Sequence, residues 1–259
     1  MVKQPEKVSK HQSGAQSIRR TIAILRSVSK YNETGARLSK IAKDVALPAS
    51  TVHRILAVLL EENFLVFKPM DRHYHLGTEL YALGEATRQF SIRDRYHTTI
   101  QRITEQTNDA TYLIIRSGND GICIDRAIGK FRVQVMGFDI GERRPLGIGA
   151  SCLALLSFLP EDDREKILKA NTSMYLKYYG IKADEVRAWL KKTREMKYAQ
   201  SIHRVTPDSI GVGAPIFNKN GQVVAAISTT GITIRMTPER CKEIAKIILS
   251  EIAAVEPPD

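Results

Sequence analysis

The spacing of apolar residues between residues 17 and 62 constrains the fold of this chain more than any other feature. It predicts three short helices, at residues 17–31, 39–46 and 48–62. The second helix must end before Pro48, because the residue that precedes a proline is disfavoured in helical geometry. Two helices joined by so short a connection are typical of a helix-turn-helix.

The same region predicts a compact unit with a β-hairpin at its end. Ser17 is expected to cap the first helix. Inward-facing apolar residues are expected at Ile18, Ile22, Leu25 and Val28 in the first helix and at Val52, Ile55, Leu56 and Leu59 in the third. The segment "FLVFKPMDRHYHLG" then predicts two short strands around a turn at residues 69–72. Three helices followed by a hairpin form a winged helix-turn-helix pattern.

The start of the third helix, "LPASTVHRIL", carries side chains that can read a DNA groove. With the apolar residues inward, Ser50, His53 and Arg54 face outward and Thr51 lies at the edge. Hydroxyl groups bond base edges or phosphates, and an arginine bonds guanine through two hydrogen bonds. Alternatives stay open here: the two hydroxyls serve only as helix caps, Arg54 pairs with a glutamate such as Glu61 or Glu62, and His53 is a plain surface residue.

The charge of the chain also favours an acidic partner. The net charge is +11, and residues 1–92 hold 14 Lys and Arg against 8 Asp and Glu. Side chains before and after the third helix would bracket a groove with phosphate contacts, namely Arg37, Lys40, Lys68, Arg72 and His73. Double-stranded DNA is therefore the predicted partner.

The remainder of the chain predicts an α+β domain. Strands are expected at residues 111–118, 121–128, 132–140, 210–217 and 222–229. Helices are expected at residues 150–159, 161–170, 183–197 and 237–254. Asn220-Gly221, between the last two strands, is a strong hairpin signal. An antiparallel sheet packed with helices is an α+β arrangement.

Composition and motifs argue against several other classes of protein. The three cysteines are widely spaced and form no C-x-x-C pair, so neither a disulfide framework nor a metal site is expected. Residues 1–16 are expected to be a polar, flexible arm, and they lack the apolar core of a signal peptide. No segment has the ~20 apolar residues needed to cross a membrane. A cytoplasmic protein without a cofactor is expected.

These segments together resemble one family. The run from residue 17 to 85, with "LPASTVHRIL" and the "YHLG" that closes the wing, looks like the N-terminal domain of the IclR-type bacterial transcription regulators. "RRPLGIGASCLALLSFLP" and "SIGVGAPIFNKNGQVVAAISTTG" resemble that family's effector-binding domain. The resemblance implies a winged helix-turn-helix at residues 17–76, a linker helix with dimer contacts at 77–92, and a GAF/PAS-like effector-binding and oligomerisation domain at 93–259.

The resemblance also implies where a small organic acid binds. The glycine-rich "GIGAS" opens into a helix whose free backbone N–H groups favour an anion. By matching motif, the effector contacts are Gly149, Ala150, Ser151, Cys152, Ser201, Gly211, Ser228 and Thr230, with Met136 as an apolar wall. Ser201 and Gly211 stand where glyoxylate-responsive relatives carry Asp and Cys, which leaves room for a larger acid, including an aromatic one.

The predicted function is a sequence-specific transcription regulator whose DNA binding responds to this carboxylate. It is expected to act as a homodimer or a dimer of dimers on an inverted-repeat operator. A second hypothesis is a DNA-binding regulator whose C-terminal domain only oligomerises. A third is an enzyme that uses Cys152, at a helix N-terminus, as a nucleophile, although no sequence motif supplies an oriented base.

Overall fold

The computed structural model describes residues 15–86 and 92–258. Contacts divide the chain into two compact units between Phe90 and Ser91, and each unit is described by itself. Residues 1–14 of the predicted arm and residues 87–91 of the predicted linker helix lie outside the described residues. Within the described ranges, no helix is both long enough and apolar enough to span a membrane.

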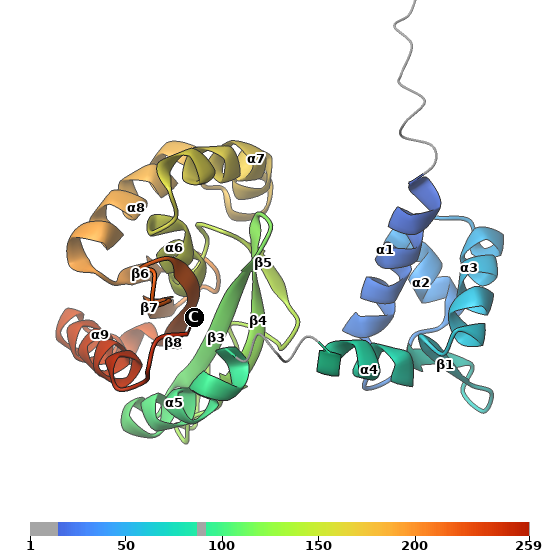
Figure 1. Ribbon diagram of the computed structural model, residues 1–259, viewed down its shortest axis with the longest axis horizontal. Coiled ribbons are helices and arrows are strands. Elements are labelled where there is room, and N and C mark those ends of the chain that lie inside the picture. Colours follow the sequence, from blue (N-terminus) through green and yellow to red (C-terminus); the bar gives the residue numbers. More distant parts are fainter. Residues whose placement is uncertain (1–14, 87–91, 259) are drawn as a thin grey trace, which may run out of the picture. The chain divides into compact units, whose positions relative to one another are not determined.

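The N-terminal unit consists of three helices, a β-hairpin and a fourth helix (Figure 1). Its elements are α1 (Gln16–Lys30), α2 (Leu38–Val45), α3 (Ala49–Glu61), β1 (Leu65–Lys68), β2 (His73–Leu76) and α4 (Thr78–Ala86). The two strands pair antiparallel, with Lys68 opposite His73, and Tyr74 forms a further bridge with Ala36 in the turn after α1. The predicted winged helix-turn-helix is thereby confirmed.

The apolar face of α3 lies where the spacing places it. Val52, Leu56 and Leu59 are buried, and Ile55 is half-buried against the same core. They pack with Ile41 of α2 and with residues of α1 and β2. Because these side chains are fixed inward, the opposite face of α3 is left to solvent.

The apolar stripe predicted for α1 is wrong in its first half. Ile18 and Ile22 are 61% and 42% exposed, whereas Ile24 and Val28 are fully buried. Ile18 and Ile22 follow helical spacing, and so do Ile24 and Val28. Only the position of α2 and the hairpin determines which of the two pairs is covered. Ser17 is not the cap either, because α1 begins at Gln16 after an Ala15 N-cap.

A six-stranded antiparallel sheet forms the framework of the C-terminal unit, in the order β5-β4-β3-β8-β7-β6. Its strands are β3 (Ala110–Ser117), β4 (Asp120–Ala127), β5 (Arg143–Pro145), β6 (Ala199–Ile202), β7 (Ser209–Phe217) and β8 (Val223–Ile232). The predicted Asn220-Gly221 hairpin joins β7 to β8.

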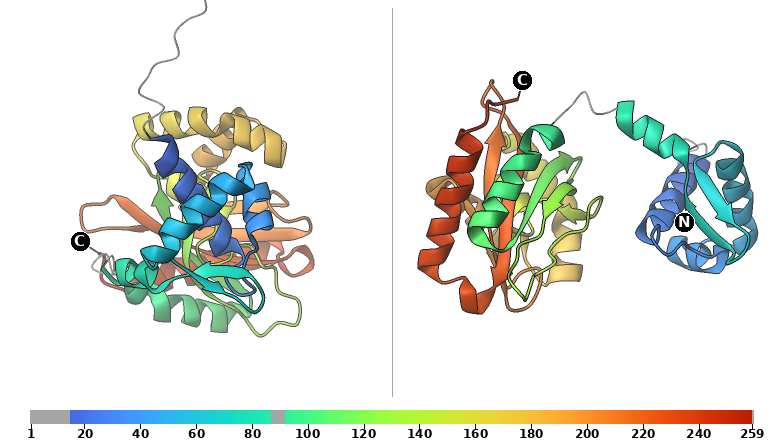
Figure 2. Two further views of the ribbon diagram at one scale, coloured as in Figure 1. Left: turned by 90° about the vertical axis from the view of Figure 1, so that its right-hand side faces the viewer. Right: turned by 90° about the horizontal axis from the view of Figure 1, so that it is seen from below.

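Helices cover both faces of this sheet (Figures 1 and 2). On one face lie α5 (Ile92–Thr107) and α9 (Pro238–Ala253), and on the other lie α6 (Ala150–Ser157), α7 (Glu161–Tyr179) and α8 (Ala183–Met196). Thr237 caps α9 as its spacing before Pro238 predicts, since its side chain accepts a hydrogen bond from the backbone N–H of Arg240. The α+β prediction is confirmed.

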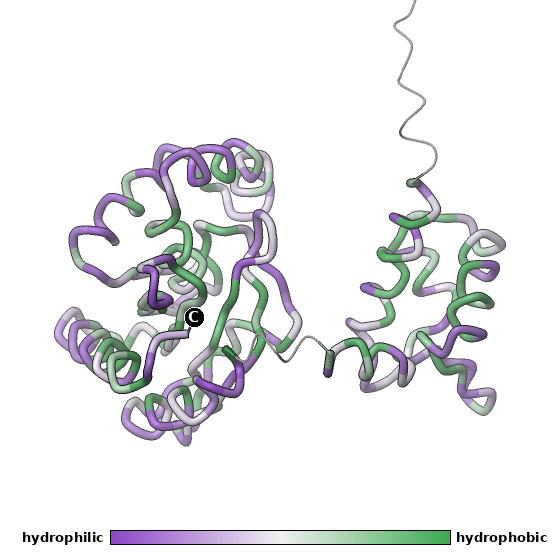
Figure 3. Tube along the Cα trace, in the orientation of Figure 1, coloured by the Kyte–Doolittle hydropathy of each residue, from purple (hydrophilic) through white to green (hydrophobic). Residues whose placement is uncertain are grey.

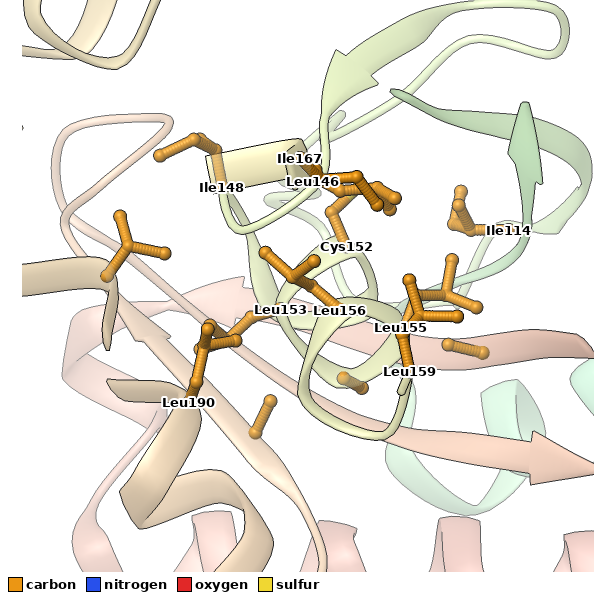
Figure 4. Close-up of a cluster of buried hydrophobic side chains, with 14 of the residues drawn as sticks. Ile114, Leu146, Ile148, Cys152, Leu153, Leu155, Leu156, Leu159, Ile167 and Leu190 are labelled. Atoms are coloured by element: carbon orange, nitrogen blue, oxygen red, sulfur yellow. The ribbon is translucent and has the colours of Figure 1, made fainter. Parts of the chain in front are cut away.

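The two faces have separate apolar cores because side chains alternate along each strand. On β3, Tyr112 and Ile114 pack towards α6, whereas Leu113 packs towards α5 and α9. All of α6 is buried, and its leucines pack with residues such as Ile114, Leu146 and Ile167 (Figure 4). Figure 3 shows the contrast with α7 and α8, which are largely hydrophilic on their outer sides.

One local prediction in this unit differs from the structure, and three elements, α5, β5 and β6, were not predicted. Residues 132–140 do not form the predicted strand. Their alternation of apolar residues is real, but Val133, Met136 and Ile140 are exposed, and the strand that pairs with β4 at this edge is the short β5 instead. The helix α5 and the edge strand β6 were not predicted, because α5 is rich in polar residues and β6 is only four residues long.

Candidate DNA-binding surface and ligand cavity

The first turn of α3 presents uncapped polar side chains. Pro48 is the N-cap residue, and the helix has no side-chain cap. Ser50 is exposed and Thr51 is half-buried. Capping is therefore not the role of these hydroxyls, and both are available to an external partner.

Arg54 and His53 lie on the same exposed face of α3. In the part of the chain that the structure describes, Arg54 forms no ion pair with Glu61, Glu62 or any other carboxylate. The salt-bridge alternative for Arg54 therefore does not hold within this unit. An exposed guanidinium without a local partner, one turn from the helix N-terminus, suits the recognition of a base edge.

The cationic residues predicted to flank the groove fall into two groups: exposed side chains, and side chains that are in contact with a neighbouring side chain. Arg37, which precedes α2, and Lys68 and Arg72 of the hairpin are exposed, and the hairpin is in contact with α3. Arg72 has a φ of 57°, the left-handed conformation that the tight turn requires.

Lys40 and His73 are held by neighbouring side chains. The Lys40 Nζ lies 3.3 Å from Asp44 and 5.0 Å from the centre of the Tyr31 ring. Hydrogen bonding to Tyr31, and then to Asp44, raises the pKa of Lys40. The His73 Nδ1 lies 3.3 Å from Asp71. A phosphate would have to compete with these contacts, so Lys40 and His73 are weaker candidates than Arg37 and Arg72.

The predicted effector residues gather at the N-terminus of α6. A small cavity of about 30 Å³ lies there. Seven of the nine predicted residues line it, namely Gly149, Ala150, Ser151, Ser201, Gly211, Ser228 and Thr230. Met136 and Cys152 do not line it. The half-exposed Met136 lies in the segment that was wrongly predicted as a strand.

Glycines on β7 allow α6 to begin directly over the sheet. A Cβ atom on Gly213 would lie 3.1 Å from the backbone nitrogen of Ser151, and one on Gly211 would lie 3.3 Å from the Cβ of Ala150. The N-cap Gly149 has a φ of 82°, which glycine adopts without strain. Having no side chain, Gly149 cannot cap α6, so the first N–H groups of the helix can face a ligand.

Arg144 is the main feature of this cavity that the sequence motifs do not predict. It is 6% exposed, and its guanidinium stacks 3.8 Å from the centre of the Phe138 ring. It donates a hydrogen bond of 2.5 Å to the backbone oxygen of Gly137, and it lies 3.6 Å from Glu142. In the sequence Arg144 is one of two adjacent arginines, and nothing there distinguishes it from a surface residue.

The hydroxyl of Ser151 is the least satisfied group in the cavity. Ser151 is 1% exposed, and its Oγ has no hydrogen-bond partner among the described residues. A buried hydroxyl without a partner costs free energy of roughly 1–3 kcal/mol. A bound molecule with a polar group would recover part of that cost.

A second cavity of about 120 Å³ adjoins the first. Both cavities are lined by Gly149 and Ser201. The second one is also lined by Trp189, Lys192 and Arg204, and the Arg204 guanidinium lies 4.4 Å over the Trp189 ring.

Cys152 lies on the other side of α6 from the first cavity. Its side chain is fully buried in the apolar core (Figure 4), where a Cβ on Gly121 of β4 would approach its Sγ to 2.6 Å. Burial raises the pKa of the Cys152 thiol to about 12. The thiol is therefore protonated at neutral pH, which argues against a nucleophilic role. No cluster of three or more metal-binding side chains occurs within residues 15–86 and 92–258.

We expect the native chain to show no rapid reaction with Ellman's reagent near pH 8. All three cysteines are buried, and burial raises the pKa of Cys123 to about 12 and also raises that of Cys241. After unfolding in guanidinium chloride, all three thiols should react at once. Rapid labelling of Cys152 in the folded chain, located by mass spectrometry, would contradict this assignment and revive the enzyme hypothesis.

A winged helix-turn-helix with an uncapped polar first turn, followed by an α+β domain, defines the class of DNA-binding transcription regulators. The chain belongs to the IclR family of bacterial transcriptional regulators. Residues 84–255 match the family model for the "Bacterial transcriptional regulator IclR C-terminal", and residues 17–69 match the "IclR helix-turn-helix domain". The recognition made from the motifs is confirmed.

Individual relatives agree with this assignment. The HTH-type transcriptional regulator KipR of Bacillus subtilis is 28% identical over 205 residues, which are 78% of this chain and 81% of KipR. The structure of the Thermotoga maritima IclR is similar, with a TM-score of 0.68, 27% identity, and coverage of 92% of this chain and 96% of that one. An IclR homologue from Microbacterium hydrocarbonoxydans, complexed with 4-hydroxybenzoate, shares the fold with a TM-score of 0.73 at 20% identity, covering 92% of this chain and 100% of that one.

Proposed function

We propose that this regulator binds an inverted-repeat operator as a homodimer or a dimer of dimers, in the cytoplasm, and that a small organic acid bound beside α6 changes its operator affinity. The observation that carries the ligand response is the cavity with the unpartnered Ser151 hydroxyl and the buried Arg144. Operator reading is assigned to Ser50, Thr51, His53 and Arg54, with backbone contacts from Arg37, Lys40, Lys68, Arg72 and His73.

Three features of the cavity favour a carboxylate over a neutral ligand. A guanidinium bonds a carboxylate through two parallel hydrogen bonds. Ser151 can donate one more. The N-terminus of α6 adds typically ~0.3–1 kcal/mol for an anion, and up to ~2 kcal/mol where the site is partly buried. The relative from Microbacterium hydrocarbonoxydans, whose crystal structure contains 4-hydroxybenzoate, supports an acid of the aromatic class.

The surface of α4 supports assembly into dimers. None of its residues is buried, yet Tyr81 and Leu83 are large and are 70% and 48% exposed. Large apolar side chains left in contact with solvent, here on different sides of α4, mark a surface that another chain can cover. A second copy of α4 would cover it and would place two recognition helices on two half-sites related by two-fold symmetry.

The acid acts only through a difference in affinity. It shifts operator binding to the extent that it binds one arrangement of the dimer more tightly than the other. Gly137, Phe138 and Arg144 line the first cavity, where the Arg144 guanidinium contacts the Phe138 ring and the Gly137 carbonyl. An entering carboxylate would replace the Gly137 carbonyl as the hydrogen-bond acceptor of the Arg144 guanidinium. Ligand binding would thereby change a contact of the segment that precedes β5.

The test begins with selection of binding sites from a random double-stranded DNA pool by the full-length chain. We expect an enriched inverted repeat, and an affinity for it that falls steeply with salt because phosphate contacts release counterions. Benzoate and 4-hydroxybenzoate are then titrated against the operator complex. A change in operator affinity that saturates, and that Arg144→Gln weakens, supports the proposal. An operator that no organic acid affects would favour the hypothesis that the C-terminal domain only oligomerises.

A further inference from the structure

We infer that the effector is an elongated acid with an anionic group at each end, and that it occupies both cavities at once. This inference rests on the proposed function, because it assumes that an acid binds beside α6. It names the chemical class of that acid as dicarboxylate, with an aliphatic or flat aromatic body.

The size of the first cavity requires a second compartment. A space of about 30 Å³ holds two or three water molecules, since a water needs roughly 10–15 Å³ on this measure. For comparison, an engineered apolar cavity that binds benzene has a volume of about 150 Å³. The first cavity therefore accommodates one carboxylate, and the body of the effector must extend into the adjoining space of about 120 Å³.

The shared walls determine the direction in which the body extends. Gly149 and Ser201 line both cavities. Gly149 has no side chain, and Ser201 has a small one, so neither residue forms a thick partition. The helix α8, which carries Trp189 and Lys192, lies along the outer compartment. The effector thus runs from the N-terminus of α6 towards α8.

Charge at the two ends points to two anionic groups. Arg144 lines the inner cavity, and Lys192 and Arg204 line the outer one. The residues lining the two cavities include no Asp or Glu. Lys192 and Arg204 form no ion pair among the described residues, so a monoanion bonded to Arg144 would leave both cations of the outer compartment without a carboxylate. A second carboxylate at that end satisfies both.

The two ends differ in burial, which predicts different roles. Arg144 and Ser151 are almost fully buried, so their hydrogen bonds to an acid form in a low dielectric and provide most of the affinity. Lys192 and Arg204 are exposed, so they contribute less to the affinity for the acid. Their role is to discriminate between effectors. Trp189 offers an apolar surface beside them for the body of the ligand.

The experiment compares matched pairs of acids on the full-length chain by calorimetry and by thermal shift. Dicarboxylates from succinate to suberate are paired with monocarboxylates of equal length, and terephthalate is paired with benzoate. We expect at least one dicarboxylate to bind roughly tenfold to hundredfold more tightly than its monocarboxylate partner, as the net gain of one additional charged hydrogen bond implies. Equal affinities within every pair would overturn the inference, while the proposed function would stand.

Variants separate the two ends of the site. The double variant Lys192→Gln/Arg204→Gln removes exposed charges and should fold normally, as circular dichroism can verify. It should lose the preference for the dicarboxylate and keep the affinity for the monocarboxylate. Arg144→Gln should weaken the binding of both the dicarboxylate and the monocarboxylate. Retention of the preference in the double variant would overturn the inference, and failure of every acid to bind the wild-type chain would overturn the proposed function together with it.

Discussion

Replacement of Arg54 by alanine should reduce operator affinity by roughly five- to 150-fold without unfolding the chain. The range corresponds to the loss of one bidentate arginine–guanine contact, worth ~1–3 kcal/mol. Arg54 is exposed on α3 and has no ion pair in the described structure, so its removal breaks no internal contact. The measurement is fluorescence anisotropy with the selected operator, accompanied by a thermal melt.

The Arg54→Lys variant is the matched control, because lysine keeps the charge but lacks the planar fork that bonds guanine. If Arg54 reads a base, the lysine variant should lose almost as much affinity as the alanine variant, and it should tolerate other bases at one operator position. If Arg54 only contacts phosphate, lysine should restore binding. Unchanged affinity of a folded Arg54→Ala chain would remove this residue from the interface.

Replacement of Gly77 by alanine should destabilise the N-terminal unit. A Cβ atom on Gly77 would lie 2.1 Å from the backbone oxygen of Asn63. That backbone cannot move aside freely, because the Gly77 N–H donates to the oxygen of Phe64 at 2.8 Å and the Glu79 N–H donates to the oxygen of Asn63 at 3.3 Å. We expect a loss of roughly 1–3 kcal/mol in the free energy of unfolding, as for other overpacked sites.

Gly84→Ala is the matched control. It makes the same chemical change, but we expect it to stabilise the chain rather than destabilise it. Gly84 lies inside α4, and a Cβ atom there would have no atom within 4 Å among the described residues, apart from its chain neighbours and the nearby backbone of the same helix. Alanine in a helix interior is favoured over glycine by up to about 1 kcal/mol. Denaturant titration of both variants measures the difference. A Gly77→Ala chain as stable as the Gly84→Ala chain would show that the hairpin closes without the close approach seen in the structure.

The N-terminal unit could be predicted in detail because its signals are local. The bounds of α2, α3 and the hairpin follow from apolar spacing, from Pro48 and from a turn at residues 69–72. The exposed face of α3 follows as the complement of Val52, Leu56 and Leu59. The prediction for Ile18 and Ile22 was wrong, which shows the limit of this reasoning. Two rows of apolar residues on α1 have the same helical periodicity, and contacts with other segments determine which row is buried.

The cavity was only partly predictable, because its walls come from segments far apart in the chain. Motifs led to the glycines and hydroxyls of α6, β7 and β8. They did not lead to Phe138, which lies within the segment wrongly assigned as a strand at residues 132–140, or to Arg144, which follows that segment. They also did not lead to Trp189, Lys192 and Arg204.

The sequence by itself therefore determined the class of the protein through its motifs. It also determined the positions of most helices and strands and the polar side chains on the exposed face of α3, because these depend on periodicity and turn chemistry within short segments. The tertiary structure alone decided which arginine is buried. It also decided that the Ser151 hydroxyl has no hydrogen-bond partner among the described residues, that Cys152 is buried in the core, and that two small cavities adjoin at Gly149. Burial and cavity shape arise where segments that are far apart in the sequence pack together, and a local sequence pattern does not predict that packing.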